Sequence, residues 1–258
     1  MSTVNLRGVW EIVNSHYPFE LAEAWDSSGV IVGDWEQPVN RILLSTDLTN
    51  AVVTEAIDKK CDLLITHHPM WLGRHNIREF PYKLDTTLKA VSNGLAIMNA
   101  HTNADNANPG VSDAIAALLN LNETVPLIPS EFDANVGTGR IGKLSNPVLL
   151  SDFAATISTA NPSLRVRYAG EAGKFVQKVA VVGGSGDSFM ATATQAGADV
   201  YVTSDVRHHP LQEHLEAGGC AIVEINHAVA ESLWLENLAK HLHAFEVELS
   251  ESNTVGWI

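Results

Sequence analysis

The chain has 258 residues, 45% of them hydrophobic, and its 16 basic and 30 acidic residues give a net charge of −14. This composition is typical of a soluble globular α/β protein with a substantial hydrophobic core. The negative charge argues against binding to extended nucleic acid or to a membrane surface, since anionic phosphates would repel it. No stretch approaches the roughly 18–20 apolar residues of a membrane span. Residues 1–10 lack the pattern of a secretory signal.

Two cysteines, Cys61 and Cys220, each precede an apolar run that is typical of a strand. Buried small side chains explain them better than a disulfide does, so we expect a reducing, cytoplasmic compartment. The chain also holds 11 histidines, and these are unevenly spread.

Strand and helix patterns alternate along the first half of the chain. The helical spacing of Leu6, Val9 and Val13 predicts a helix that Pro18 ends. Thr49 is predicted to cap a later helix. The other predicted helices lie near residues 85–92 and after Pro109, and the predicted strands are residues 30–32, 42–44, 63–65 and 96–98.

The second half continues this alternation after a stretch rich in proline and glycine. That stretch, residues 126–147, predicts a passage between two lobes. A helix at 151–160 and strands at 164–168 and 179–182 are expected beyond it. The succession predicts an α/β class with mainly parallel strands. We expect a first lobe of residues 1–125, against which residues 235–258 pack, and a second lobe of residues 126–234.

The two halves of the sequence repeat one another. The segment CDLLITHHP at 61–69 resembles ADVYVT at 198–203, which a second His-Pro follows five residues later. In the first half GLAIMN runs into His101-x-x-x-Asp105, and in the second GCAIV runs into His227-x-x-x-Glu231. A pseudo-twofold arrangement of the two halves would bring both sets of strand ends to one crevice. In open α/β sheets such a crevice is where ligands bind.

The repeated residue types suit a pair of divalent metal ions. Imidazole and carboxylate are usual ligands of Zn, Mn and Fe, and no cysteine lies among them to favour a thiolate site. Successive residues of a strand point to opposite faces of the sheet, so His67 and His68 can bind two neighbouring metals only if the strand ends there. Pro69 supplies that end. His227 and Glu231 fall on one face if a helix starts near His227. We therefore expect two divalent ions per chain, zinc first among them, with coordination positions left open for water.

Each motif also has a structural alternative. A His-His pair after a strand occurs by chance in loops, and His-x-x-x-Glu can be a surface hydrogen-bonded pair. His101 either binds metal or fixes Asp105 or its turn. Three further residues, Asp205, His208 and His209, either orient ligands or contact substrate, or they belong to a solvated helix start. The glycines of residues 183–186 either hold an anion or form a plain tight turn, which is favoured.

Six motifs occur in order across nearly the whole chain. They are Trp25-Asp26-x-x-Gly29, Thr66-His67-His68-Pro69, Ala100-His101-Thr102-Asn103-x-Asp105, Gly184-Ser185-Gly186-x-Ser188-Phe189, Thr203-x-Asp205 and His227-x-x-x-Glu231. Together they resemble the family labelled GTP cyclohydrolase 1 type 2 homologue, also called NGG-interacting-factor-three-like.

The resemblance implies a set of ligands and an assembly. Two metals would be held by five residues, namely His67, His68, Asp105, His227 and Glu231. Two interlocked α/β lobes and a homohexameric ring with the metals facing its cavity are also implied. Ser204 and Asn226 stand where the family tends to have glycine. These departures lie beside the expected site and remove no ligand.

The family label names a cyclohydrolase reaction, for which the residues give partial support. A two-metal centre can activate water, and His101 or His208 could act as general acid or base. Basic residues that could hold a triphosphate are sparse near the motifs, where the nearest in sequence are Arg74, Arg78 and Arg207.

Three functions therefore stay open. The first is a two-metal hydrolase that acts on a nucleotide or related small molecule, with GTP among the candidates. The second is a metal-handling protein without catalysis, and the third is an interaction scaffold that metals stabilise. Open coordination positions favour the first over the third, because structural sites usually close their ligand shell. The sequence does not separate the first function from the second.

Overall fold

The computed structural model of the chain describes residues 4–71 and 80–252 and divides into two compact units. The first unit comprises residues 1–107 and 235–258, and the second comprises residues 108–234. The division differs from the expected boundary at residue 125. Helix α5 (Val111–Leu118) and strand β5 (Asn122–Val125) belong to the second unit, where β5 pairs with β8 (Arg140–Leu149).

The first unit is built on a five-stranded sheet of order β1-β4-β3-β2-β13. Strands β13, β2, β3 and β4 run parallel, and β1 pairs antiparallel with β4. The interior strands are continuous apolar runs, as expected for parallel strands covered on both faces. The strand bounds are β1 (Gly29–Val32), β2 (Arg41–Ser45), β3 (Leu63–Thr66), β4 (Ala96–Asn99) and β13 (Glu246–Leu249).

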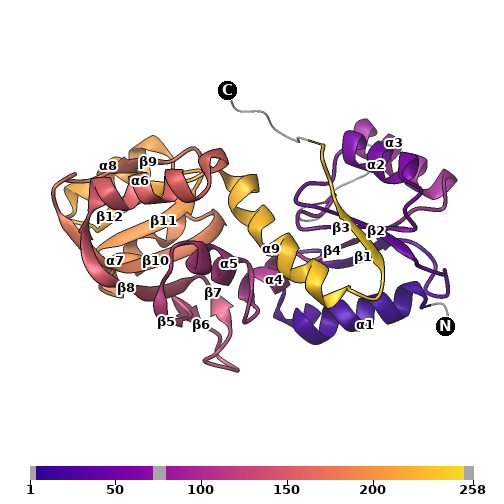
Figure 1. The fold of residues 1–258 in the computed structure, drawn as a ribbon, viewed down its shortest axis with the longest axis horizontal. Helices are drawn as coiled ribbons and strands as arrows, with labels where there is room; N and C mark the ends of the chain where they lie inside the picture. Colours follow the sequence, from indigo (N-terminus) through magenta and orange to yellow (C-terminus); the bar gives the residue numbers. More distant parts are fainter. Residues whose placement is uncertain (1–3, 72–79, 253–258) are drawn as a thin grey trace. The chain divides into compact units, whose positions relative to one another are not determined.

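Helices cover both faces of this first sheet. Helices α2 (Asn50–Asp58) and α3 (Pro81–Ser92) pack on one face, and α1 (Leu6–His16) lies across the other (Figure 1). The predicted cap of α2 is confirmed, since the side chain of Thr49 accepts a hydrogen bond from the Val52 amide. A short helix, α4 (Thr102–Asn106), follows β4.

The second unit holds a six-stranded sheet of order β5-β8-β10-β11-β12-β9. Its strands include β9 (Arg167–Ala169), β10 (Phe175–Ser185), β11 (Val200–Ser204) and β12 (Ala221–Glu224). Only β10, β11 and β12 pair in parallel, whereas β5, β8 and β9 pair antiparallel with their neighbours. The α/β class is confirmed, but the expectation of mainly parallel strands is wrong for this sheet.

The stretch at residues 126–147 does not link the two units. It lies within the second unit, where β6 (Ile128–Pro129) and β7 (Gly137–Thr138) form a two-stranded sheet and β8 follows. Arg140, which is buried, donates to the carbonyl groups of Gly137 and Gly139 and forms an ion pair with Asp113. The glycines and prolines therefore shape turns inside the unit.

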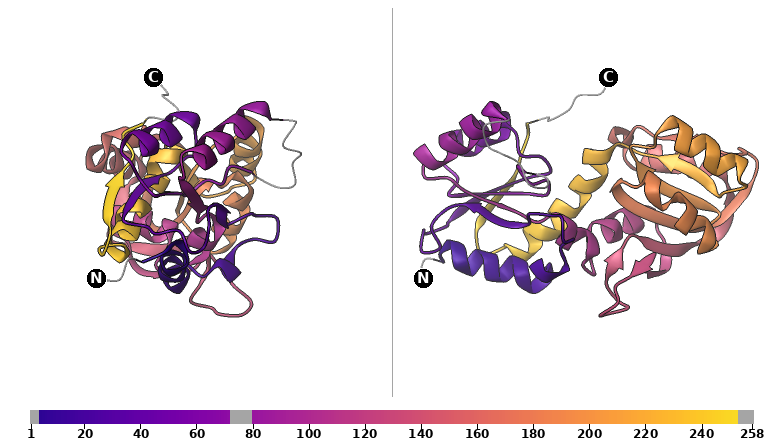
Figure 2. Two further views of the ribbon diagram at one scale, coloured as in Figure 1. Left: turned by 90° about the vertical axis from the view of Figure 1, so that its right-hand side faces the viewer. Right: turned by 180° about the vertical axis from the view of Figure 1, so that it is seen from behind.

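Helices also cover both faces of the second sheet (Figures 1 and 2). Helix α6 (Leu150–Ala160), α5 and the first part of α9 (His227–His241) share one core with the sheet. Helix α7 (Met190–Gln195) and α8 (His208–Glu216) contribute to the core on the other face. In the described part of the chain, short 3-10 helices lie at Phe19–Leu21, Pro162–Leu164 and Asp187–Phe189.

The two sheets share a topological pattern that agrees with the sequence repeat. The order β1-β4-β3-β2 in the first corresponds to β9-β12-β11-β10 in the second. In both, one antiparallel edge strand is followed by three parallel strands. A pseudo-twofold axis between the units stays a prediction.

Both cysteines are buried thiols, as the sequence indicates, and neither is in a disulfide. Burial raises the pKa of Cys61 to about 11, which keeps its thiol protonated at neutral pH. Within residues 4–71 and 80–252, no helix combines the length and apolar character that crossing a membrane requires.

Glu55 of α2 holds the segment that follows β13. Its carboxylate accepts hydrogen bonds from the Ser250 hydroxyl at 2.7 Å and from the Ser252 amide at 3.1 Å. It also forms an ion pair with Lys59 at 2.9 Å. Burial raises the pKa of Glu55, but the bonds from these partners outweigh burial and lower it to about 2.

This shift predicts an acid-dependent loss of stability. Because the pKa in the folded chain lies below the ordinary value of 4.5, the stabilisation is complete above pH 4.5 and is lost as pH falls through 2. We expect Glu55→Gln to lower the unfolding free energy by about 1–2 kcal/mol at pH 7. Thermal unfolding of both proteins should show a smaller difference near pH 2, and an equal difference at the two pH values would contradict this account.

Candidate metal centre

His67 and His68 lie at the carboxyl end of β3, where the strand turns. Backbone pairing with the neighbouring strand β2 continues past the end of β3, since His67 N donates to Ser45 O and His68 N donates to Thr46 O. The Thr66 hydroxyl donates to His68 O at 2.8 Å and closes the turn before Pro69. The two imidazole centroids are 5.1 Å apart. Both rings therefore lie at the same sheet edge.

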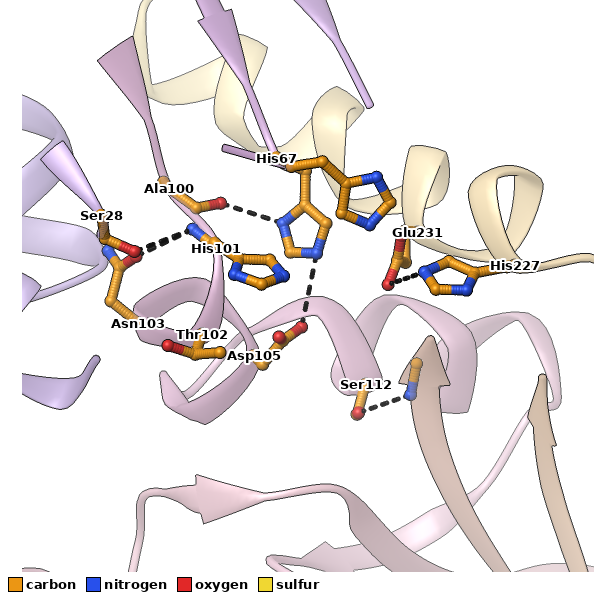
Figure 3. A network of polar contacts seen from close by, with 12 residues as sticks. Ser28, His67, Ala100, His101, Thr102, Asn103, Asp105, Ser112, His227 and Glu231 are labelled. Atoms are coloured by element: carbon orange, nitrogen blue, oxygen red, sulfur yellow. Dashed lines mark hydrogen bonds and ion pairs between the residues drawn. The ribbon is translucent and has the colours of Figure 1, made fainter. Parts of the chain in front are cut away.

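The His67 ring is completely buried and has a fixed orientation (Figure 3). Its Nδ1 donates to the carbonyl oxygen of Ala100 at 2.9 Å, so the lone pair lies on Nε2. That Nε2 faces Asp105 Oδ1 at 3.7 Å, which is beyond hydrogen-bond range. Two ligands bound at about 2.0–2.1 Å to one tetrahedral ion are roughly 3.4 Å apart. The spacing of His67 and Asp105 is close to that value.

His101 is held by the buried carboxylate of Asp26. His101 Nδ1 donates to Asp26 Oδ1 at 3.0 Å, and the Thr102 hydroxyl donates to Asp26 Oδ2 at 2.6 Å. Burial raises the pKa of Asp26, but the hydrogen bonds from His101, Thr102 and Ser28 outweigh it and hold the pKa well below its usual range. Asp26 is therefore ionised. This gives the Trp25-Asp26 motif a physical role in orienting an imidazole.

His68 is oriented in the same way by Asp47. His68 Nδ1 and Asp47 Oδ1 are 2.6 Å apart. The coordinating atoms available on His67, His68 and His101 all lie within 4.8 Å of one another. The sequence left the role of His101 open, and the structure groups it with the other two histidines of the first unit.

The second unit presents His227 and Glu231 on the first turns of α9. Asn226 caps this helix, because its side chain accepts from the Val229 amide at 3.1 Å. His227 Nε2 and Glu231 Oε1 are 3.1 Å apart, as the spacing of four residues predicts, and Glu231 is 3% exposed. His227 Nδ1 lies 2.6 Å from Asp205 Oδ2, so Asp205 orients this ring (Figure 3 shows the pair of His227 and Glu231).

Gly184, at the end of β10, lies directly against this pair. Its φ of +72° is in the left-handed region, and a Cβ there would be 2.5 Å from Glu231 Oε1 and 3.3 Å from His227 Nε2. The Thr203 hydroxyl donates to Gly184 O at 3.2 Å and fixes this segment. The glycine sequence thus gives a close approach of backbone to side chain, which the motif alone did not reveal.

Other candidate residues lie apart from these donors. His208 is exposed and lines a cavity of about 180 Å³ whose wall includes Arg167 and Tyr168 but neither His227 nor Glu231. Arg207 forms an ion pair with Asp187. The two remaining arginines considered for a triphosphate, Arg74 and Arg78, lie outside the described residues.

The same hydrogen-bond pattern occurs at four histidines, namely His67, His68, His101 and His227. Each Nδ1 is hydrogen-bonded to a carbonyl or carboxylate oxygen, which leaves Nε2 as the nitrogen suited to coordination. A carboxylate, Asp105 or Glu231, lies near one of these Nε2 atoms in each unit. These residues fit a divalent metal ion. The sequence missed Asp26 and Asp47 as orienting groups, although Asp47 follows a strand end, as a ligand-site residue often does.

The family comparison covers nearly the whole chain. The sequence profile of Duf34/NIF3 (NGG1p interacting factor 3) matches residues 4–255. A protein of Streptomyces coelicolor named GTP cyclohydrolase 1 type 2 homolog is 37% identical over 250 residues, which span 93% of this chain and 88% of the relative.

Solved structures agree with the fold. A hypothetical protein of Staphylococcus aureus is 26% identical, with a TM-score of 0.89 and complete coverage of both chains. A Bacillus cereus protein described as related to NIF3 is 22% identical, with a TM-score of 0.91 and complete coverage of both chains. At that identity the second likeness supports the fold alone.

Proposed function

The chain belongs to the Duf34/NIF3 family, and on that premise we propose that it binds two divalent metal ions and hydrolyses a nucleotide or related small molecule. Zinc is the first candidate, followed by manganese and iron. The proposed ligands are His67, His68, Asp105, His227 and Glu231. The observation that carries this proposal is the shared orientation of the imidazoles, whose Nδ1 atoms are tied to oxygen acceptors.

Metal ions at these residues would supply Lewis-acid polarisation of a substrate and a lowered pKa for water. The chain's own contribution is to hold the ligands. Asp47 and Asp205 orient His68 and His227, while Gly184 lets Glu231 lie close to the backbone of β10. His101, fixed by Asp26, has its Nε2 close to the other two imidazoles of its unit. His101 is therefore our candidate for proton transfer or for a further ligand.

Five ligands shared between two ions leave coordination positions open. Structural metal sites usually close their shell with four protein ligands, so the donor set favours catalysis over a purely structural role. The absence of cysteine from the set also argues against a structural thiolate site.

A metal-handling protein is the second candidate. The observation that favours it is the state of Arg207, whose guanidinium is committed to Asp187 and is thus less suited to holding a triphosphate. With the net charge of −14, this weakens the argument for GTP itself as substrate. We place either function in the cytoplasm, because the two cysteines suit a reducing compartment, and in a homohexameric ring, as the resemblance implies.

Metal content tests the proposal. Protein reloaded with Zn or Mn and freed of excess ions should carry up to two ions per chain in elemental analysis. The double substitution His67→Ala plus His68→Ala should lose most of them, because it removes two Nε2 ligands. An exposed histidine, His209→Ala, is the matched control and should retain the metal. A reloaded wild type without metal would contradict the ligand assignment.

An activity panel then separates the two functions. Metal-loaded protein would be incubated with GTP, other nucleotides and phosphodiesters, and the products would be followed by chromatography. Metal-dependent turnover that the histidine substitutions remove would support the hydrolase. Stable metal binding with no turnover, combined with transfer of ions to an acceptor chelator, would support metal handling.

A further inference from the structure

A cavity of about 310 Å³ lies in the first unit, between the start of α2 and the start of α3. Leu48 and Met70 form apolar parts of its wall, while Asn50 and Lys83 form polar parts. The ring of Tyr82, which is largely exposed, forms part of its rim. Its volume is at the lower end of the range for small-molecule sites, so a metabolite would fit it better than a polymer.

Two walls of this cavity continue from the segments that hold His68. Leu48 follows Asp47, whose carboxylate orients His68, and Met70 lies two residues after His68. These segments directly follow the carboxyl ends of β2 and β3, and the two strands pair in parallel. Ligands of open α/β sheets bind outside such strand ends. The cavity is therefore built on the same sheet edge as the histidines of the first unit.

Lys83 is the cationic residue among those that line this cavity. Its Nζ donates to the carbonyl oxygen of Met70 at 2.5 Å and lies 5.1 Å from the centroid of the Trp71 ring. Burial lowers the pKa of Lys83. Among the residues that the structure describes, no carboxylate lies within ion-pair distance of its Nζ. An ammonium group has three protons, so two remain for an incoming acceptor.

We propose that this cavity binds the anionic group of a small organic phosphate or carboxylate, with Lys83 as the counter-charge. The inference rests on the proposed function, for which it supplies a class of substrate and the residue that anchors it. A partly desolvated cation gains most from an anionic partner, because charge-assisted hydrogen bonds are the strong ones. Asp85, which also borders the cavity, is exposed, so water screens its repulsion.

Anion binding by the metal-free chain tests this assignment directly. Inorganic phosphate and acetate would be titrated at constant ionic strength into protein stripped of metal, with tryptophan fluorescence and calorimetry as readouts. We expect Lys83→Gln to weaken phosphate binding about tenfold and Lys83→Arg to retain it. Lys174→Gln, at an exposed position of the second unit, is the matched control and should bind like the wild type. The two anions distinguish a phosphate site from a carboxylate site.

Two results would overturn the assignment. One is equal phosphate and acetate affinity in Lys83→Gln and the wild type, and the other is no binding of either anion by the wild type at millimolar concentration. Circular dichroism and the retained binding of Lys83→Arg guard against a misfolded variant.

The metal proposal fails independently of this one. Elemental analysis of Lys83→Gln should give the metal content of the wild type, because Lys83 contacts none of the proposed ligands. Anion binding that depends on Lys83 in a chain that takes up no metal would contradict the proposed function and leave the cavity assignment intact. Full metal loading together with unchanged anion binding in Lys83→Gln would contradict the cavity assignment and leave the proposed metal binding intact.

Discussion

Replacing Gly184 with alanine is expected to weaken metal binding at His227 and Glu231 about tenfold or more. The new Cβ would lie 2.5 Å from Glu231 Oε1, a distance that forces either the carboxylate or the strand end to move. Because Thr203 holds the Gly184 carbonyl, the strand end has little freedom to yield. The carboxylate, and with it the spacing to His227 Nε2, should therefore shift.

A matched glycine separates this clash from backbone strain. Gly218 has φ +77°, close to the +72° of Gly184, but a Cβ at Gly218 would meet nothing within 4 Å. Both alanine variants should lose a similar stability of about 1 kcal/mol from the left-handed conformation. Zinc affinity by chelator competition, together with thermal unfolding of the metal-free proteins, would compare them. Equal zinc affinity in Gly184→Ala and Gly218→Ala would show that the clash does not position Glu231.

The strands that sequence predicted best are those with apolar residues on both faces. Residues 42–44 and 63–65 lie in the middle of parallel strands, where burial on both sides leaves no place for polar side chains. Strand β5 could not be found in this way, because all four of its residues are exposed. Strand β8 combines the buried Arg140 with exposed residues, and its proline suggests a loop. This is why the sequence placed the start of the second unit after residue 125, whereas the compact unit begins at residue 108.

The orienting groups were harder to find than the ligands proposed from the motifs. Asp26 reaches His101 across 75 positions of sequence, and Asp47 reaches His68 across 21. Nothing in the local pattern marks either aspartate as a partner, since an aspartate near a strand end also suits a turn. Asn226 illustrates the opposite case. It departs from the glycine typical of the family, yet its side chain supplies the cap from which α9 starts at His227.

The cavity beside α3 was also beyond the reach of sequence. Lys83 precedes the helix predicted near residues 85–92, and nothing in the local sequence marks it as a residue of a ligand site. Its burial depends on Met70 and Trp71, which follow the histidines of another segment. A functional reading of Lys83 therefore requires the tertiary structure, whereas the histidine motifs carried their own signal.

Substituting Glu231 with glutamine should abolish any metal-dependent hydrolysis, whatever the substrate proves to be. The buried carboxylate of Glu231 lies 3.1 Å from His227 Nε2, so both can bind the same ion. A neutral amide is a much weaker ligand for a divalent cation than a carboxylate, and it removes the negative charge that offsets the ion. We expect at least a hundredfold loss of turnover, roughly the range in which lost catalytic electrostatics are measured. The histidines of the first unit should still hold one ion.

The measurement pairs elemental analysis with turnover for three variants. Glu236→Gln, an exposed carboxylate on the same helix, controls for charge and should retain both metal and activity. His208→Ala should keep both ions, because His208 lines a cavity that includes neither His227 nor Glu231. Slower turnover in His208→Ala, at full metal content, would assign that residue to proton transfer or substrate binding. If Glu231→Gln hydrolyses the substrate at the wild-type rate, the two-metal mechanism is wrong, and metal handling becomes the better account of the same ligands.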